Sequence, residues 1–324
     1  MLLFASKSSA ALATKVAVCL GTELASLEER DFEDGEQKTR PLVSVRGHDV
    51  YVLQSLHGGP NESANDKLCR LLFLVATMRD NGAARTTAVV PYLAYSRKDR
   101  QTKARDPVTT QYIARLFEAV GTNCVVTLDV HNIVAFQNAF RCTTIHLDTR
   151  RLFGQYLRNL LSASSLVVAS PDPGGVKRAQ LFRETLERLI GRPIGQAFMD
   201  KRRSAGVVSG DLLVGDVRGS SVLVIDDLIA SGGTMARAAR ASLEHGAKDV
   251  VAVATHGLFT GDARKTLAEA PLAHTIITDT VPPFRLDPIF AERHVEIVSA
   301  APLFAEAIKR LHFGGSISEM SEGS

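Results

Sequence analysis

Short apolar runs alternate with amphipathic stretches along the first half of this chain. Apolar residues fill segments 50–53, 87–90 and 125–128, and each run predicts a strand buried on both faces of a sheet. Apolar residues recur at helical spacing near 66–78 and 109–119, which predicts helices that follow those strands. Strands that alternate with helices are typical of an α/β domain with a parallel sheet.

The same order repeats in the second half of the chain, which predicts a second α/β domain. There the predicted strands are 166–169, 222–225, 250–254, 275–278 and 295–298, and the predicted helices lie near 176–189 and 235–243. A length of 324 residues also favours two domains. We expect domains over 1–149 and 150–312, each a mostly parallel sheet flanked by helices, and a disordered polar tail over 313–324.

The charge and cysteine content argue for an ordinary cytoplasmic protein. Basic side chains number 38 and acidic ones 35, so net charge gives no reason to expect a nucleic acid or a membrane surface as partner. No run approaches the roughly 20 apolar residues of a membrane span. The four cysteines have no C-x-x-C spacing, and most lie in apolar surroundings typical of reduced core thiols. The apolar N-terminus lacks a basic leading segment, so it predicts a strand and a helix rather than a signal peptide.

The segment VLVIDDLIASGGTM, residues 222–235, predicts a phosphate site. It joins a buried strand to a helix through a glycine-rich turn at the carboxyl end of the strand, where small ligands bind in α/β sheets. Backbone N–H groups of this turn and the helix dipole attract an anion. The turn consists of Ser231, Gly232, Gly233 and Thr234. Asp226 and Asp227 precede it and are suited to accept hydrogen bonds from sugar hydroxyls or to hold a divalent cation.

Four other segments place charged or titratable residues after predicted strands. Five basic residues between Arg97 and Arg105 form a loop that either covers a polyphosphate or is a solvated surface. His131 in LDVHN is either a ligand or a structural histidine. Asp172 in SPDPGG suits a metal or a phosphate-bound water, whereas the nearby Lys177 and Arg178 are explained by a charged first helical turn alone.

The fourth segment is MDKRRS, residues 199–204. In an extended conformation Lys201 and Arg203 point to the same side, which suits a pair of cations that clamps one polyphosphate. A solvated basic turn explains the same residues equally well.

Seven motifs together make the chain resemble the ribose-phosphate diphosphokinase, or phosphoribosyl pyrophosphate synthetase, family over nearly its full length. In order, they are RDFEDGE from Arg30, LQSLHGGPNESAND, PYLAYSRKDR, TLDVHN, SPDPGG, MDKRR and GDVRGSSVLVIDDLIASGGT. The resemblance implies two tandem type I phosphoribosyltransferase-like domains, with the sugar-phosphate loop in the second alone. It implies a Mg²⁺-dependent transfer of the diphosphoryl group of ATP to C1 of ribose 5-phosphate, and a homo-oligomer, dimer or hexamer.

The resemblance also assigns roles to individual residues. Adenine recognition falls to Phe32, Asp34 and Glu36, and the ATP phosphates to Arg97 with its neighbours Lys98 and Asp99. His131 and Asp172 are assigned to the metal–ATP site, and Lys201 and Arg203, with Arg97, to charge neutralisation in catalysis. Ribose 5-phosphate is assigned to Asp226, Asp227 and the loop 231–234.

Departures from the family pattern leave two other functions open. Ala230 stands where the pattern DD-x-x-D-[ST] has a third acid, TLDVHN differs from DLH-[AS]-x-Q, and Pro173 replaces a small residue. One alternative is a phosphoribosyltransferase that consumes phosphoribosyl pyrophosphate, although such an enzyme needs neither FEDGE nor the basic loop. The other is a non-catalytic regulatory subunit of a synthetase, which Ala230 favours and the complete set of basic residues opposes.

Overall fold

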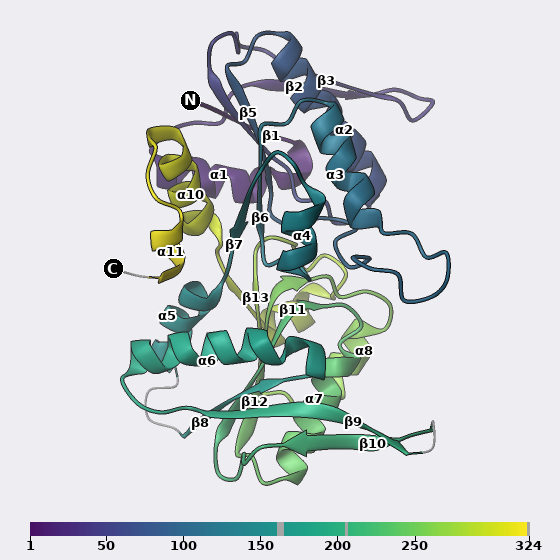
Figure 1. Cartoon of the computed structure of the whole chain (residues 1–324), viewed down its shortest axis with the longest axis vertical. Coiled ribbons are helices and arrows are strands. Elements are labelled where there is room, and N and C mark those ends of the chain that lie inside the picture. The colour runs from purple at the N-terminus through teal and green to yellow at the C-terminus, as the bar shows by residue number, and fades with distance from the viewer. Residues whose placement is uncertain (161–164, 205–206, 323–324) are drawn as a thin grey trace. The chain divides into compact units, whose positions relative to one another are not determined.

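The computed structural model describes the backbone of residues 1–160, 165–204 and 207–322, and the side chains of 1–158, 165–200 and 212–320 (Figure 1). The chain forms two compact units, Met1–Asp148 with Ser299–Ser324 and Thr149–Val298. Each is an α/β unit with a mostly parallel sheet, as the sequence predicts.

The first unit contains a five-stranded parallel sheet in the order β1-β4-β5-β6-β7. The strands are β1 (Leu2–Ala5), β4 (Asp49–Leu53), β5 (Arg85–Val90), β6 (Cys124–Leu128) and β7 (Thr143–Leu147). Helices α2 (Ala64–Asp80), α3 (Thr109–Ala119) and α4 (Ile133–Ala139) pack on one face, and α1 (Ala10–Leu20) and α10 (Ala301–Phe313) lie on the other (Figure 1). A separate hairpin, β2 (Leu27–Asp31) and β3 (Gln37–Pro41), lies beside α2.

The second unit contains a seven-stranded sheet in the order β10-β9-β8-β11-β12-β13-β14, in which β10 alone runs antiparallel to its neighbour among the described pairs. The strands are β8 (Leu166–Ser170), β9 (Gly195–Ser204), β10 (Val207–Val214), β11 (Ser221–Ile229), β12 (Asp249–Gly257), β13 (His274–Thr278) and β14 (Val295–Val298). The helices are α5 (Arg150–Leu160), α6 (Val176–Ile190), α7 (Gly233–Glu244), α8 (Ala263–Ala268) and α9 (Pro288–His294).

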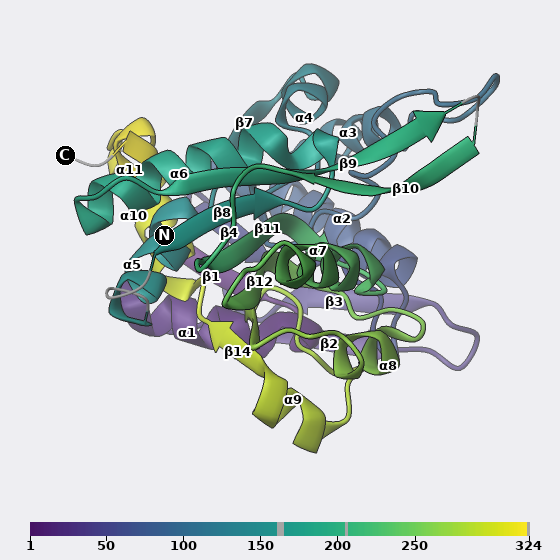
Figure 2. The same cartoon turned by 90° about the horizontal axis from the view of Figure 1, so that it is seen from below.

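Alternation along β11 explains why this strand reads as a continuous apolar run. Val222 and Val224 pack into the core beneath α7 and α8, whereas Leu223 and Ile225 pack against α5 and α6 on the opposite face. Figure 2 shows α6 and α7 on opposite sides of the sheet. Since successive side chains of a strand point to opposite faces, a sheet covered on both sides requires apolar residues at every position.

The C-terminal segment differs from the expected division of the chain. We expected residues up to 312 in the second domain, but Ser299–Ser324 belongs to the first unit, where α10 packs against α1. Arg85 Nη2 donates to the Leu311 carbonyl over 2.9 Å, and His312 Nδ1 lies 2.8 Å from Asp49 Oδ2. These polar contacts and the apolar face of α10 return the chain to the first sheet.

The structure also differs from the expected disordered tail over 313–324. Residues Ser318–Glu322 form a short helix, α11, and Arg310 Nη1 lies 2.9 Å from Glu319 Oε2. An ion pair at this spacing holds the short helix beside the end of α10, which composition alone did not indicate.

Two further sequence expectations concern membranes and thiols. No described helix is both long and apolar enough to cross a membrane. Four free thiols are present, as expected, but Cys19 and Cys69 are exposed on helix surfaces rather than buried in the core. Burial raises the pKa of the Cys124 thiol to about 12, so this cysteine fits the core interpretation.

Candidate functional site

The glycine-rich turn of the second unit lies where the sequence predicts it. β11 extends through the acid pair to Ile229, and α7 begins at Gly233. Gly232 adopts φ +78°, a conformation that favours glycine, and a Cβ there would approach Leu267 to 3.1 Å. The first-turn amides of α7 have no intrahelical acceptor, so they are available to an anion in the turn of Ser231 to Thr234.

Asp226 and Asp227 both form ion pairs with Arg178. The sequence explains this arginine only as part of a charged helical turn. Arg178 Nη1 lies 3.4 Å from Asp226 Oδ1 and 3.3 Å from Asp227 Oδ1. Burial and the adjacent Asp227 carboxylate raise the pKa of Asp226, and Arg178 counteracts part of that rise. Arg178 lies in the first turn of α6, the first α-helix after β8, and this position was the sequence signal that could have identified it.

Asp172 shares this edge of the sheet because β8 and β11 are parallel neighbours. Its Oδ1 accepts a hydrogen bond from the Gly175 N–H over 3.0 Å, so it caps the 3₁₀ turn Pro173–Gly175. A Cβ on Gly175 would approach the Ser170 hydroxyl to 2.6 Å, which explains the second glycine of SPDPGG. One oxygen of the Asp172 carboxylate therefore caps the 3₁₀ turn, a structural role that the sequence did not predict.

The predicted clamp lies on β9. The backbone pairs Lys201 with Asp211 and Arg203 with Val208, so the two basic positions are two apart on one strand and share a face. The side chains of Lys201 and Arg203 lie outside the described residues.

In the first unit, the basic loop and the His131 segment are in direct contact. Asn132 Nδ2 donates to Asp99 Oδ2 over 2.6 Å, while Asn132 Oδ1 caps α4 by accepting from the N–H groups of Val134 and Ala135. His131 and Arg97 lie close to these residues in the sequence, and both are exposed to solvent. The structure therefore brings Asp99 to the segment of His131, and Asn132, which sequence reasoning did not single out, makes that connection.

A second contact closes the basic loop on itself. The Asp106 carboxylate accepts hydrogen bonds from Lys98 Nζ, from the Thr102 hydroxyl at 2.7 Å and from the Lys103 N–H at 2.9 Å. Hydrogen bonds from Lys98 and Thr102 hold the pKa of Asp106 well below its usual range. Lys98 therefore donates to Asp106 in this structure, whereas the family resemblance assigned it to the ATP phosphates.

The base of the loop carries strained backbone. Tyr95 has φ +65°, which is unusual for a bulky residue, and Asp129 at the end of β6 has φ +42°. The Tyr95 hydroxyl donates to Asn65 Oδ1 in the first turn of α2. Non-glycine residues in this region cluster at functional sites, so the strain agrees with a binding role for these loops.

The predicted adenine-recognition residues lie at the tip of the β2–β3 hairpin. Phe32 is 38% exposed, and the Arg30 guanidinium carbon lies 4.9 Å from the centre of its ring. The tip is closed by a hydrogen bond from the Phe32 N–H to the Glu36 carbonyl, at 2.8 Å, and by one from the Glu36 N–H to Asp34 Oδ1, at 3.0 Å. An ordered tip that presents an exposed aromatic ring is suited to stack on a planar base.

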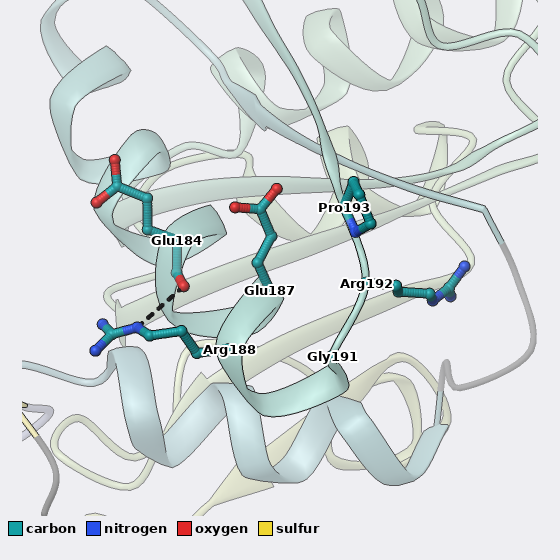
Figure 3. A pocket seen from close by; sticks show the side chains of 6 residues that line it. All are labelled: Glu184, Glu187, Arg188, Gly191, Arg192 and Pro193. Atoms are coloured by element: carbon teal, nitrogen blue, oxygen red, sulfur yellow. Dashed lines mark hydrogen bonds between the residues drawn. The ribbon is translucent and has the colours of Figure 1, made fainter.

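A depression lies at the C-terminal end of α6. Figure 3 shows its lining, Glu184, Glu187, Arg188, Gly191, Arg192 and Pro193. The Glu184 carbonyl accepts from Arg188 Nε, and Glu187 Oε1 accepts from the Ile194 N–H at 2.9 Å. Since α6 has 15 residues, this depression lies about 20 Å along the helix from its first turn, where Arg178 contacts the acid pair.

Among the described residues no cluster of three or more His, Cys, Asp or Glu side chains forms a metal-binding group. Mg²⁺ in nucleotide enzymes is bound by one or two carboxylates together with substrate phosphates and water, so a full protein cage is not required. Asp172 has a second carboxylate oxygen beyond the one that caps the turn, and the acids Asp226 and Asp227 lie at the same sheet edge. These donors fit a cation that arrives with a phosphate ligand.

Comparisons with known proteins cover almost all of the chain. Residues 1–121 match the N-terminal domain of ribose phosphate pyrophosphokinase, and residues 209–321 match the phosphoribosyl synthetase-associated domain. A ribose-phosphate pyrophosphokinase of Caldanaerobacter subterraneus subsp. tengcongensis is 39% identical over 319 residues, which cover 98% of this chain and 96% of that protein. Ribose-phosphate pyrophosphokinase 2 of Saccharomyces cerevisiae is 35% identical, with 98% and 95% covered.

A solved structure agrees with these sequence relatives. The crystal structure of phosphoribosylpyrophosphate synthetase from Mycobacterium smegmatis superposes with a TM-score of 0.87 at 33% identity, over 97% of this chain and 99% of the other.

Proposed function

The chain belongs to the ribose-phosphate pyrophosphokinase family, and from that premise we propose that it transfers the diphosphoryl group of ATP to ribose 5-phosphate. The observation that carries the proposal is the acid pair Asp226 and Asp227, joined by Arg178 beside a glycine-rich turn. Such a turn suits a sugar phosphate, and the acids suit the sugar hydroxyls. The products are 5-phosphoribosyl 1-pyrophosphate and AMP.

In the proposed reaction, the C1 hydroxyl oxygen of ribose 5-phosphate forms a bond to the β-phosphorus of ATP. The bond from that phosphorus to the α,β-bridging oxygen breaks, AMP leaves with the bridging oxygen, and the hydroxyl proton is released. Phosphoryl transfer has a loose, anionic transition state, so alignment and charge neutralisation provide most of the catalysis. We assign the neutralising charge to Lys201, Arg203 and Arg97.

We propose that the first unit supplies the ATP contacts. The hairpin tip with Phe32, Asp34 and Glu36 is assigned to the base, and the loop of Arg97, Lys98 and Asp99 to the phosphates. Lys98 donates to Asp106 and to the Thr102 hydroxyl, which leaves one of its three N–H donors for a phosphate oxygen, whereas Arg97 is exposed.

Mg²⁺, when bound to ATP, withdraws charge from the phosphates. We propose that His131 and Asp172 contact this cation or its water, and the second Asp172 oxygen fits that role. Replacing both by Ala should raise the Mg²⁺ concentration at half-maximal activity and leave the KM for ribose 5-phosphate nearly unchanged. An unchanged metal dependence would return both residues to structural roles.

One assay separates the proposal from its two alternatives. The purified protein is incubated with ATP, Mg²⁺ and ribose 5-phosphate, and AMP and the sugar product are followed together. Equal amounts of both products, lost in an Asp227→Asn control, support the synthetase. Release of pyrophosphate from phosphoribosyl pyrophosphate and a nucleobase, without ATP, supports a phosphoribosyltransferase. The second alternative, a regulatory subunit, is favoured by Ala230 and predicts no turnover until a catalytic partner is added.

A further inference from the structure

Arg70 on α2 holds two acids from segments outside its own helix. Its Nη2 lies 2.6 Å from Asp31 Oδ1, at the end of β2, and 3.0 Å from Glu62 Oε1, in the loop before α2. The Arg70 side chain is 5% exposed, whereas that of Asp31 is 75% exposed. The contact therefore joins a fixed, buried cation to a surface residue of the hairpin.

Burial makes these partners necessary for the guanidinium. A buried cation is costly unless acids surround it, and breaking one partner away leaves charge uncompensated. Burial lowers the pKa of Arg70, but the hydrogen bond to Asp31 and the charge of Glu62 outweigh it, so the pKa is raised. These acids therefore stabilise the charged form of Arg70.

The position of Asp31 within the hairpin gives this ion pair a specific effect. Asp31 pairs with Gln37 in the β2–β3 ladder, and this pair is the last before the tip at 32–36. Gln37 Nε2 donates over 3.0 Å to the Asp66 carbonyl in the first turn of α2. Both residues that flank the tip are therefore fastened to α2, Asp31 through Arg70 and Gln37 directly.

We propose that Arg70 is a positioning residue for ATP, which fixes the direction of the hairpin tip by holding Asp31 against α2. This inference rests on the proposed function, in which the tip residues recognise the base. Arg70 contacts no substrate in this role. It fixes the position of Phe32, so its loss should weaken the binding of ATP and leave the binding of ribose 5-phosphate unchanged.

The test compares Asp31→Ala with Glu28→Ala. Both remove one carboxylate from β2, but Glu28 pairs with Arg40 inside the hairpin, at 2.6 Å, and does not contact Arg70. Asp31→Ala should raise the Kd for ATP, measured by calorimetry, about threefold, because a partly exposed ion pair contributes a free energy of that order. Hydrogen exchange over residues 27–41 should become faster. The KM for ribose 5-phosphate and kcat should stay within about twofold. Glu28→Ala should leave the Kd for ATP and both kinetic constants unchanged, although the loss of its cross-strand pair with Arg40 speeds exchange inside the hairpin.

A second variant, Arg70→Lys, keeps the charge with a single donor group and should fall between the native protein and Asp31→Ala. Unchanged exchange in the hairpin of Asp31→Ala would overturn the anchoring. Faster exchange with an unchanged Kd for ATP would overturn the positioning role. A native protein that binds ATP but turns over no ribose 5-phosphate contradicts the proposed enzyme instead, while the Kd comparison still decides the role of Arg70.

Discussion

Asn132 donates its side-chain amide to the Asp99 carboxylate over 2.6 Å, across 33 residues of sequence. The same Asn132 caps α4 with its amide oxygen, so one side chain fixes both the His131 segment and the basic loop. Neither motif predicts this contact alone, because Asp99 and Asn132 lie in loops after different strands, β5 and β6, which only the parallel sheet brings together.

The Asp99–Asn132 contact can be tested with an isosteric exchange. Asn132→Asp keeps an oxygen for the α4 cap but replaces the donor with a second carboxylate beside Asp99. We expect the KM for ATP to rise about fivefold, because a charge-assisted hydrogen bond is lost and a like-charge pair is formed at a partly exposed position. Adding Asp99→Asn reverses the pair and should restore the native KM. Steady-state kinetics of the native protein and the two variants decide this, and failure of the reversal would show that Asp99 acts on its own.

The proposed clamp predicts a loss in kcat rather than in affinity. Lys201→Ala or Arg203→Ala should lower kcat on the order of 10³-fold, with smaller changes in both KM values, because the neutralised charge develops mainly in the transition state. Lys248→Ala, at an exposed position before β12, is the control for removal of a cation. If both clamp variants lose less than about tenfold, the residues are misassigned.

Replacing Arg178 should shift the pH dependence of kcat/KM for ribose 5-phosphate. Arg178→Met removes the cation that counteracts the raised pKa of Asp226, so this pKa should rise further. Sugar binding that requires the ionised acid should then fail at a higher pH than in the native protein. We expect the KM for ribose 5-phosphate to rise about tenfold at pH 7, and the acid limb of kcat/KM to move upward in pH. Lys177→Met, an exposed neighbour in the same turn, should leave the pH profile in place.

The sequence predicted the strand ends well and the contacts between them poorly. The loop 231–234 could be found because a buried strand, two acids, a glycine turn and a helix are all local. Arg178 and Asn132 could not be ranked above their neighbours, since their partners lie 48 and 33 residues away. The β2–β3 hairpin was also missed, because β2 is the largely polar LEERD and shows no apolar alternation.

The C-terminal helix shows a related limit. The choice of sheet for α10 depends on Asp49 and Arg85, more than 200 residues earlier. Chain order therefore favoured the second domain, whereas the polar contacts attach the helix to the first.

Asp49 makes this attachment dependent on pH. Burial raises its pKa, but hydrogen bonds from Arg85, His312 and Tyr51 outweigh burial and leave the pKa lowered. A lowered folded-state pKa contributes stability above the unfolded value of about 3.9, and the contribution disappears as pH falls through the folded value. Asp49→Asn should therefore lower the free energy of unfolding at pH 7, and the difference from the native protein should shrink below about pH 4.

Urea unfolding at several pH values measures this difference. Asp80→Asn removes a carboxylate from an exposed pair with Arg79 and should have almost no effect at any pH. A difference between Asp49→Asn and the native protein that stays constant down to pH 3 would show that the charge of Asp49 does not hold the helix.

Ala230 bears most directly on whether the protein is catalytic. It stands between the end of β11 and the glycine turn, half-buried, and its carbonyl accepts from the Thr260 N–H over 2.9 Å. We predict an active enzyme that binds the sugar through Asp226, Asp227 and the amides of the turn. Ala230→Asp should then tighten ribose 5-phosphate binding by roughly tenfold, because one hydrogen bond to a charged group contributes about 1.5 to 3 kcal/mol. The matched control is Ala230→Asn, which adds the same volume without charge and should recover only part of the gain. Turnover and the sugar KM of the three forms separate the cases. A native protein that is inert with ATP, Mg²⁺ and ribose 5-phosphate, and remains inert as Ala230→Asp, would instead support the regulatory subunit, since restoring the acid cannot supply a missing catalytic partner.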